Sequence, residues 1–365
     1  MRLRPPLLLL AGSTVAAAVI AAPGVASAAP AAAKGPTVTV LNRTVIAPYH
    51  LAHSGSSVYV ADGGTSTVSK LTSKGLVAVA HGPQGPAGEV AGVAINGKGT
   101  LAYTASDFAA NVHTLTIKPK HGKTRTVDLG TFEATRNPDK WIRYGIDNPT
   151  QCQRDALDAA GVPVSYRGVV DSHPYAVSAL PNDAWVVADA GGNDLLKVDR
   201  NGRISVLSVL PRQPTTITAD AAAALGLPDC VVGVVYNFEA VPTDVELAGN
   251  GRYITSLLPG GPEDPSLGAR GSVVSVNPAN GNASKLATGL LGATSVALGP
   301  NGKIFVSELF GGKISLINNG KVSTYVNIDS PLGLTFFRGA LYAGTAAPTD
   351  ENGNPTGTGT IVRIK

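Results

Sequence analysis

The chain has 365 residues, of which 15% are charged, and its formal net charge is +4. Lysines and arginines form no cluster in the sequence, which argues against a nucleic-acid partner. The 43 glycines and 26 prolines favour an all-β protein with many tight turns. Serine nucleophile elbows, phosphate-binding glycine loops, HExxH and CxxC are all missing from the sequence, which argues against the common hydrolases and nucleotide-binding enzymes.

The first residues have the pattern of an export signal. Two arginines precede an apolar run over Leu7–Ile20, and residues 26–28 (ASA) have the small-x-small pattern of a cleavage site. We therefore predict a signal peptide over residues 1–28, a flexible lead-in over residues 29–36, and a secreted, extracellular protein. The apolar run is shorter than the roughly 20 residues that a spanning helix needs, so we expect no membrane span in the mature chain.

One sequence pattern returns six times along the rest of the chain. It consists of an apolar run after a proline or a small residue, a tight turn with glycine, a β-rich run, a further glycine and a short alternating strand. The copies lie at Pro48–Leu71, Glu89–Leu115, Pro174–Val198, Pro242–Val276, Thr294–Ile317 and Pro331–Ile364. Similarity at a fixed period is typical of propellers and solenoids.

Each copy supplies three strands, and most copies are followed by a fourth, outer strand. Four antiparallel strands in about 40 residues are typical of one propeller blade. The sixth copy ends without a fourth strand, whereas a spare strand, Thr37–Ile46, precedes the first copy. We therefore predict that residues 37–365 form a single all-β domain, a six-bladed β-propeller of NHL/TolB-like type. In this prediction the N-terminal strand joins the last blade and closes the ring, leaving no exposed sheet edge.

Two insertions interrupt the period, at Lys118–Asp171 and at Arg212–Val241, and each contains one cysteine. An even number of cysteines in an exported chain predicts a disulfide, here between Cys152 and Cys230. This disulfide would tie the two insertions together over one face. Long ordered excursions on a rigid scaffold are where binding usually takes place.

Each insertion also contains the signature of a short helix. In the first, we predict a helix with Asn148 as N-cap and Pro149 as first residue, ending before Gly161. In the second, Thr218 has the position of an N-cap before a helix over 219–225.

With this repeat, export signal and pair of insertions, the chain resembles the ScyD/ScyE family of secreted NHL-like β-propeller proteins. The resemblance covers essentially the whole mature chain and is carried by residues 169–202, 241–278 and 293–315. His173 stands where the family commonly has asparagine before Pro-Tyr. The resemblance implies a six-bladed propeller in an extracellular setting, and it supplies no established activity and no catalytic residues.

An acidic residue ends the second strand of alternate copies, at Asp62, Asp189 and Glu308. A carboxylate on every other blade would form a threefold ring near the channel, suited to a hard cation such as Ca²⁺ or another divalent ion. Alternatively, each carboxylate stabilises the Gly-Gly turn that follows it by accepting backbone N–H bonds. The sequence leaves both interpretations open.

Two histidines, His50 and His173, flank prolines of first strands, which line the channel of a propeller. They are candidates for a base or a metal ligand, or for structural histidines beside a rigid turn. Together with the three acids they form a predicted ligand-binding channel mouth. Further polar candidates lie where first strands begin or in a long loop, namely Asp171, Glu239, Asp244, Glu263, Asp264 and Arg270. The WIRYG segment, residues 141–145, predicts aromatic packing beneath the first insertion.

Two functions remain compatible with these patterns. The first is a secreted binding or scaffold propeller that recognises a small molecule, a glycan or a protein through the face of the insertions. The alternative is a metal-dependent hydrolase of lactonase type, with a divalent ion in the channel. No residue of the sequence is identified as catalytic.

Overall fold

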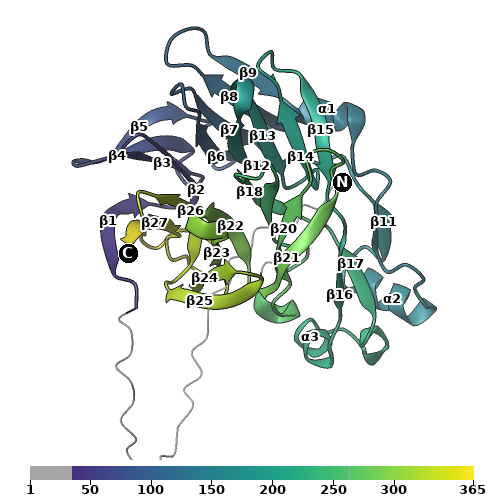
Figure 1. The fold of residues 1–365 in the computed structure, drawn as a ribbon. Helices are drawn as coiled ribbons and strands as arrows, with labels where there is room; N and C mark the ends of the chain where they lie inside the picture. The colour runs from purple at the N-terminus through teal and green to yellow at the C-terminus, as the bar shows by residue number, and fades with distance from the viewer. Residues whose placement is uncertain (1–34, 263) are drawn as a thin grey trace, which may run out of the picture.

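The computed structural model describes residues 35–262 and 264–365 (Figure 1). The predicted signal peptide, most of the lead-in and Glu263 lie outside the described residues. Within the described part of the chain, every helix is too short or too polar to cross a membrane.

The described residues form seven four-stranded antiparallel sheets, and five of these are meanders of four consecutive strands. The first two contain β2 (Pro48–Ser54), β3 (Ser57–Asp62), β4 (Thr67–Thr72) and β5 (Gly75–His81), then β6 (Gly88–Ile95), β7 (Leu101–Asp107), β8 (Val112–Lys118) and β9 (Arg125–Asp128). The third contains β12 (Pro174–Leu180), β13 (Ala184–Asp189), β14 (Asp194–Val198) and β15 (Ile204–Val209). The fourth and fifth contain β18 (Pro242–Leu247), β19 (Tyr253–Leu257), β20 (Gly271–Val276) and β21 (Ala283–Leu290), then β22 (Ala293–Leu298), β23 (Ile304–Glu308), β24 (Lys313–Asn318) and β25 (Lys321–Asn327).

The sixth sheet combines the two ends of the described chain. Its order is β1 (Val38–Val45), β28 (Gly359–Ile364), β27 (Ala340–Thr345) and β26 (Pro331–Phe337). β1 and β28 are antiparallel, so the N-terminal strand has the partner that the strand count predicts. The first strands of successive sheets contact one another in the order β2, β6, β12, β18, β22, β26, and β26 contacts β2 again. This arrangement of meander sheets is that of a β-propeller.

The hydrophobic core lies between neighbouring sheets rather than in one central cluster. One cluster, for example, joins Leu115 of β8 to Trp185 of β13 and Leu196 of β14. β13 is buried along its whole length, because its side chains pack alternately on the sheet before and the sheet after it. Aliphatic β-branched residues suit such two-sided burial.

The two insertions form the seventh sheet, which lies outside the other six (Figure 1). Its order is β11 (Ser165–Arg167), β10 (Arg143–Gly145), β17 (Val235–Phe238) and β16 (Gln213–Thr216). The predicted disulfide between Cys152 and Cys230 is confirmed, with their Cα atoms 6.3 Å apart. The unit has its own apolar cluster, which includes Ile146, Leu157 and Phe238. The insertions are thus a small folded layer rather than two separate loops.

The helices of the insertions differ in part from the prediction. α2 (Gln151–Ala159) begins two residues later than expected, because Thr150 and not Asn148 is its N-cap. The hydroxyl of Thr150 accepts from the backbone N–H of Gln153, whose side chain accepts in return from the N–H of Thr150, and this capping box outweighs the proline signal. α3 (Ala219–Ala224) begins after Thr218 as predicted.

One helix was not anticipated at all. α1 (Leu129–Arg136) follows β9 directly, and the carboxylate of Asp128 caps it by accepting from the N–H of Thr131. Its sequence contains Gly130 and two threonines, which are weak helix formers, so propensity alone does not reveal it. In the WIRYG segment the aromatic packing is divided, since Tyr144 is fully buried whereas Trp141 is 74% exposed.

We predict that the protein needs β1 to remain monomeric. β1 is mostly exposed and pairs through its backbone with β28, so a chain that begins at Ala47 presents β28 as an unpaired edge. We expect such a chain to aggregate and to melt at lower temperature than one that begins at Thr37, measured by size-exclusion chromatography and thermal unfolding. An unchanged monomer with unchanged melting would contradict the role of β1.

Candidate functional site

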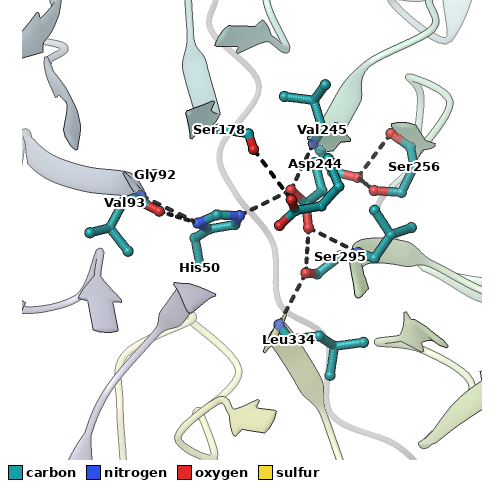
Figure 2. A network of polar contacts seen from close by, with 12 residues as sticks. His50, Gly92, Val93, Ser178, Asp244, Val245, Ser256, Ser295 and Leu334 are labelled. Carbon is teal, nitrogen blue, oxygen red and sulfur yellow. Dashed lines mark hydrogen bonds and ion pairs between the residues drawn. The ribbon is translucent and has the colours of Figure 1, made fainter. Parts of the chain in front are cut away.

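A hydrogen-bonded network fills the place where the first strands meet (Figure 2). The network includes the buried side chain of His50 on β2. Its Nδ1 lies 2.9 Å from the carbonyl oxygen of Val93 on β6, and its Nε2 lies 3.0 Å from Oδ1 of Asp244 on β18. The N–H of Val93 also lies 3.3 Å from Nδ1, so Nδ1 faces an acceptor and a donor, whereas Nε2 faces a carboxylate. Burial lowers the pKa of His50, but the Asp244 carboxylate outweighs it and the net pKa is raised. The raised pKa favours the protonated ring, which faces a buried carboxylate.

Asp244 is the centre of the network. Besides His50, its carboxylate accepts from the N–H of Val296 at 2.9 Å and from the hydroxyl of Ser295 on β22 at 2.6 Å. Ser295 in turn accepts from the N–H of Leu334 on β26 at 3.0 Å. Each bond joins one sheet to another, so the network ties the sheets together.

Glu246 completes the series. It lies two residues after Asp244 on β18 and accepts from the hydroxyl of Ser178 on β12 at 3.2 Å. Burial, and then the neighbouring Asp244, raise the pKa of Glu246 to about 7. All six first strands thus contribute at least one group to this network. Glu246 was missed in the sequence, although its spacing of two from Asp244 places both side chains on one face of a strand.

The network includes a set of side chains that could hold a metal. His50, Asp244 and Glu246 have ligand atoms within 4.8 Å of one another, and they form the one such group among the described residues. Both oxygens of Asp244 already accept hydrogen bonds, so an ion would replace part of this network. The contacts account for these residues as structural groups.

Each of the three acids of the alternate copies accepts hydrogen bonds from backbone N–H groups of its own sheet or of the segment that leads into it. Asp62 accepts from the N–H groups of residues 46 and 47, and Asp189 accepts from those of His173 and Gly192. Glu308 accepts from the N–H of Leu291 and from the Ser315 hydroxyl. The three acids are not brought together into the metal-compatible group. Only Asp189 bonds to the Gly-Gly turn that follows it, through the N–H of Gly192. Asp62 and Glu308 instead hold the backbone that leads into the first strand of their own sheet, and a ligand role for the three acids stays a prediction.

His173 lies in an ion pair between two sheets. Its Nε2 is 2.6 Å from a carboxylate oxygen of Glu89 on β6, and its ring lies edge-on to Phe108 and Tyr175. Burial lowers the pKa of His173, but Glu89 outweighs this and the net pKa is raised. Both histidines of the predicted channel mouth are therefore paired with carboxylates: His50 with Asp244 on β18, and His173 with Glu89 on β6.

A cavity of about 670 Å³ lies within the insertion layer, and we call it the insertion pocket. Its walls come from α2, β11, β17, the segments that flank α3, and the loop of residues 259–271. They are mainly apolar and include Leu157, Ile217, Leu225, Val231, Tyr236, Phe238 and Leu267. The pocket lies beside the Cys152–Cys230 disulfide, which joins the segments that wall it.

A few polar groups converge on the insertion pocket. Glu239 lines it and accepts a hydrogen bond from Tyr166, which also lines it. Burial raises the pKa of Glu239 to about 7, despite that hydrogen bond. Glu239 was a sequence candidate, whereas Tyr166 carried no signal in the sequence.

The long loop forms the rim of the insertion pocket. Arg270 stacks over the ring of Phe238, with 4.7 Å between its guanidinium carbon and the ring centroid. It donates to the carbonyl oxygens of Gly260 and Pro262 at 2.7 and 3.1 Å. Asp264 accepts from the N–H of Ser266 at 2.7 Å. Arg270 thus holds the loop over the pocket wall, and the hydrogen bonds of both Arg270 and Asp264 stabilise the loop.

No known family model and no curated protein matches the chain. Several solved structures are similar in fold. The PQQ-bound form of an aldose sugar dehydrogenase from Streptomyces coelicolor is 11% identical, with a TM-score of 0.53 over 90% of this chain and 98% of that one. A putative glucose dehydrogenase from Thermus thermophilus is 12% identical, with a TM-score of 0.54 over 91% and 100%. A putative gluconolactonase is 13% identical, with a TM-score of 0.51 over 92% and 93%. At these identities the similarity shows the propeller fold alone.

We predict a pH-dependent role for His50 in stability. The pKa of His50 is raised in the folded state, so its contribution is complete below the unfolded pKa, near 6.5, and is lost as pH rises through the folded pKa. His50→Gln leaves Asp244 as an unpaired buried charge and should cost about 3–5 kcal/mol of unfolding free energy at pH 6. The difference from the wild type should shrink towards pH 9, measured by denaturant unfolding.

His53→Gln is the matched control, because His53 lies on the same strand and bonds to Thr335 on β26. Burial lowers the pKa of His53, so its protonation opposes folding below pH 6.5, the reverse of His50. If both variants changed with pH in the same direction, the His50–Asp244 pair would not be ionic.

Proposed function

We propose that the protein is a secreted six-bladed β-propeller of ScyD/ScyE type that binds a small, mostly apolar molecule in the insertion pocket. Six sequence copies, six sheets and the cyclic contacts of their first strands support the six blades. The pairing of β1 with β28 supports closure by the N-terminal strand. The disulfide is consistent with an oxidising, extracellular location.

The insertion pocket carries the proposal for binding. Its volume of about 670 Å³ falls in the range of about 300–1,000 Å³ that is usual for small-molecule sites. Apolar walls with a few convergent polar groups are the usual composition of such sites. The central network, by contrast, has its polar groups already bonded to one another.

The polar groups of the pocket define the kind of ligand. Glu239, with Tyr166 beside it, places an acidic group in an otherwise apolar wall. A cationic amine on an apolar body would pair with the carboxylate and bury its apolar part. Because the pKa of Glu239 is about 7, the carboxylate forms above neutral pH, and we expect amines to bind more tightly at pH 8 than at pH 6.

Binding can be tested with the neutral fluorophore N-phenyl-1-naphthylamine on the full mature protein. We expect saturable fluorescence enhancement, which octylamine reverses at lower concentration than octanol, because the two competitors have the same chain and differ in charge. Ala160→Trp, at an exposed position that lines the pocket, should weaken fluorophore binding about tenfold or more. Ala159→Trp is the control, exposed one residue earlier, and should bind as the wild type does.

Glu239→Gln separates the two parts of the proposal. This variant should still bind the fluorophore but should lose the preference for octylamine over octanol. Equal binding by the wild type and Ala160→Trp would refute the insertion pocket as the binding site.

A second candidate function is metal-dependent hydrolysis at the central network. The spacing of His50, Asp244 and Glu246 supports it. Elemental analysis of the purified protein should then find a divalent ion, and Glu246→Gln should lose it. If the wild type contains no such ion and Glu246→Gln changes only stability, the central network is structural.

A further inference from the structure

Four carboxyl groups lie together between the sheet of β12–β15 and the segment that leads into the insertion layer. Glu133 is on α1, Asp139 follows that helix, Asp189 ends β13 and Asp194 begins β14. All four residues are at most 2% exposed. Each of the other three acts electrostatically on Asp194. Asp189 and Asp194 are directly opposite in the ladder of β13 and β14, so their side chains share one face.

Asp194 is the least satisfied member of this acidic cluster. Both of its carboxyl oxygens are buried and have no hydrogen-bond partner. One oxygen each of Glu133 and Asp139 is also buried without a partner. Buried polar groups nearly always have a partner, so four unpartnered oxygens in one place require something to face them.

The residue opposite the acid at the end of the second strand differs from sheet to sheet. In the sheet of β22–β25, Glu308 is opposite Lys313, and the two form an ion pair at 3.6 Å. In the sheet of β2–β5, Asp62 is opposite Thr67. In the sheet of β12–β15 the opposite residue is another acid, Asp194. The repeat has therefore replaced a basic or neutral partner by a carboxyl group.

The protein supplies little positive charge to this cluster. None of the ion pairs within the described residues involves Glu133, Asp139, Asp189 or Asp194. Neutral groups donate hydrogen bonds to the cluster, such as the hydroxyl of Tyr144 to Asp139 at 2.9 Å. His173, whose N–H bonds to Asp189, is the nearby basic group, and its ring is already paired with Glu89. Carboxylates buried together repel each other, so a cation or protons from outside the chain would relieve the repulsion.

We propose that this acidic cluster binds one hard divalent cation of the Ca²⁺ type, with Asp194 as a direct ligand. Ca²⁺ takes six to eight oxygen ligands, which include carboxylates, backbone carbonyls and waters. The four acids are spread too widely to place three ligand atoms within 4.8 Å of one another, so waters complete the ligand shell. All donors are oxygens, which suits Ca²⁺ better than zinc.

The cation would fasten the insertion layer to the propeller. Asp139 bonds to Tyr144 of β10 and to Asn193 at 3.1 Å. Asn193 also accepts from the N–H of Val241, where the second insertion ends. An ion at the acidic cluster therefore stabilises the place where both insertions join the sheet of β12–β15.

Protons are the alternative occupants of the cluster. Burial, then the neighbouring acids, raise the pKa of Asp194 well above its usual range, and burial raises that of Glu133 to about 8. If protons neutralise the cluster, the protein should become more stable on acidification, and calcium should not change its stability. The two occupants are therefore distinguishable.

The test is calcium binding to the full mature protein after dialysis against EDTA, at pH 8. Isothermal titration with CaCl₂ should give one site per chain, and calcium should raise the melting temperature. Asp194→Asn and Glu133→Gln should each weaken calcium binding at least tenfold. Asp62→Asn, at the equivalent acid of the first sheet, should leave calcium affinity unchanged.

Absence of calcium binding by the wild type would overturn the proposal. So would calcium binding that survives Asp194→Asn and Glu133→Gln, because the ion would then lie elsewhere. If Asp194→Asn raised the melting temperature of the calcium-free protein and the wild type showed no response to calcium, protons would be the occupants.

Discussion

The buried pair of His50 and Asp244 is the interaction on which the arrangement of the six sheets depends. Through Asp244 the pair connects β2 and β18 to β22, and through the His50 ring it connects them to β6. Each strand belongs to a different sheet, and hydrophobic contacts between sheets have little directional preference. A fully bonded polar network has strict geometry, so it sets how each sheet is positioned against the others. Because those groups bond to one another, the proposed ligand site lies at the periphery, in the insertion layer.

The insertion layer has the physical properties of such a periphery. It has its own apolar cluster, its own sheet and a disulfide, so its pocket does not depend on flexible loops. Asn193 connects it to the propeller by bonding to both insertions, and the loop between β19 and β20 contacts it through Arg270, which lies over the Phe238 ring. The layer and the propeller thus have separate apolar clusters, which are joined by polar contacts such as those of Asn193. Changes in the pocket walls should therefore leave the central network undisturbed.

The sequence predicted what depends on local periodicity. The repeated alternation located the strands, the spare strand 37–46 identified the partner of β28, and the position of one cysteine in each insertion identified the disulfide. It could not predict the acidic cluster, because Glu133 and Asp139 reach Asp189 only through the path of the first insertion. Tyr166 and Glu239 likewise meet across segments that share no period. Contacts within a repeat are readable from spacing, whereas contacts made by insertions depend on tertiary packing.

The joining of β1 to β28 has a consequence for the order in which the chain folds. Five meander sheets can form from neighbouring segments, whereas the sixth needs residues from both ends of the described chain. Thr37 and Lys365 exchange backbone hydrogen bonds, so this pairing closes the longest loop of the described chain. We expect it to form late, because its loop-closure entropy is the largest. A circular permutant that links residue 365 to residue 37 would turn this long-range closure into a local hairpin. The slowest step of assembly would then pass to another sheet boundary.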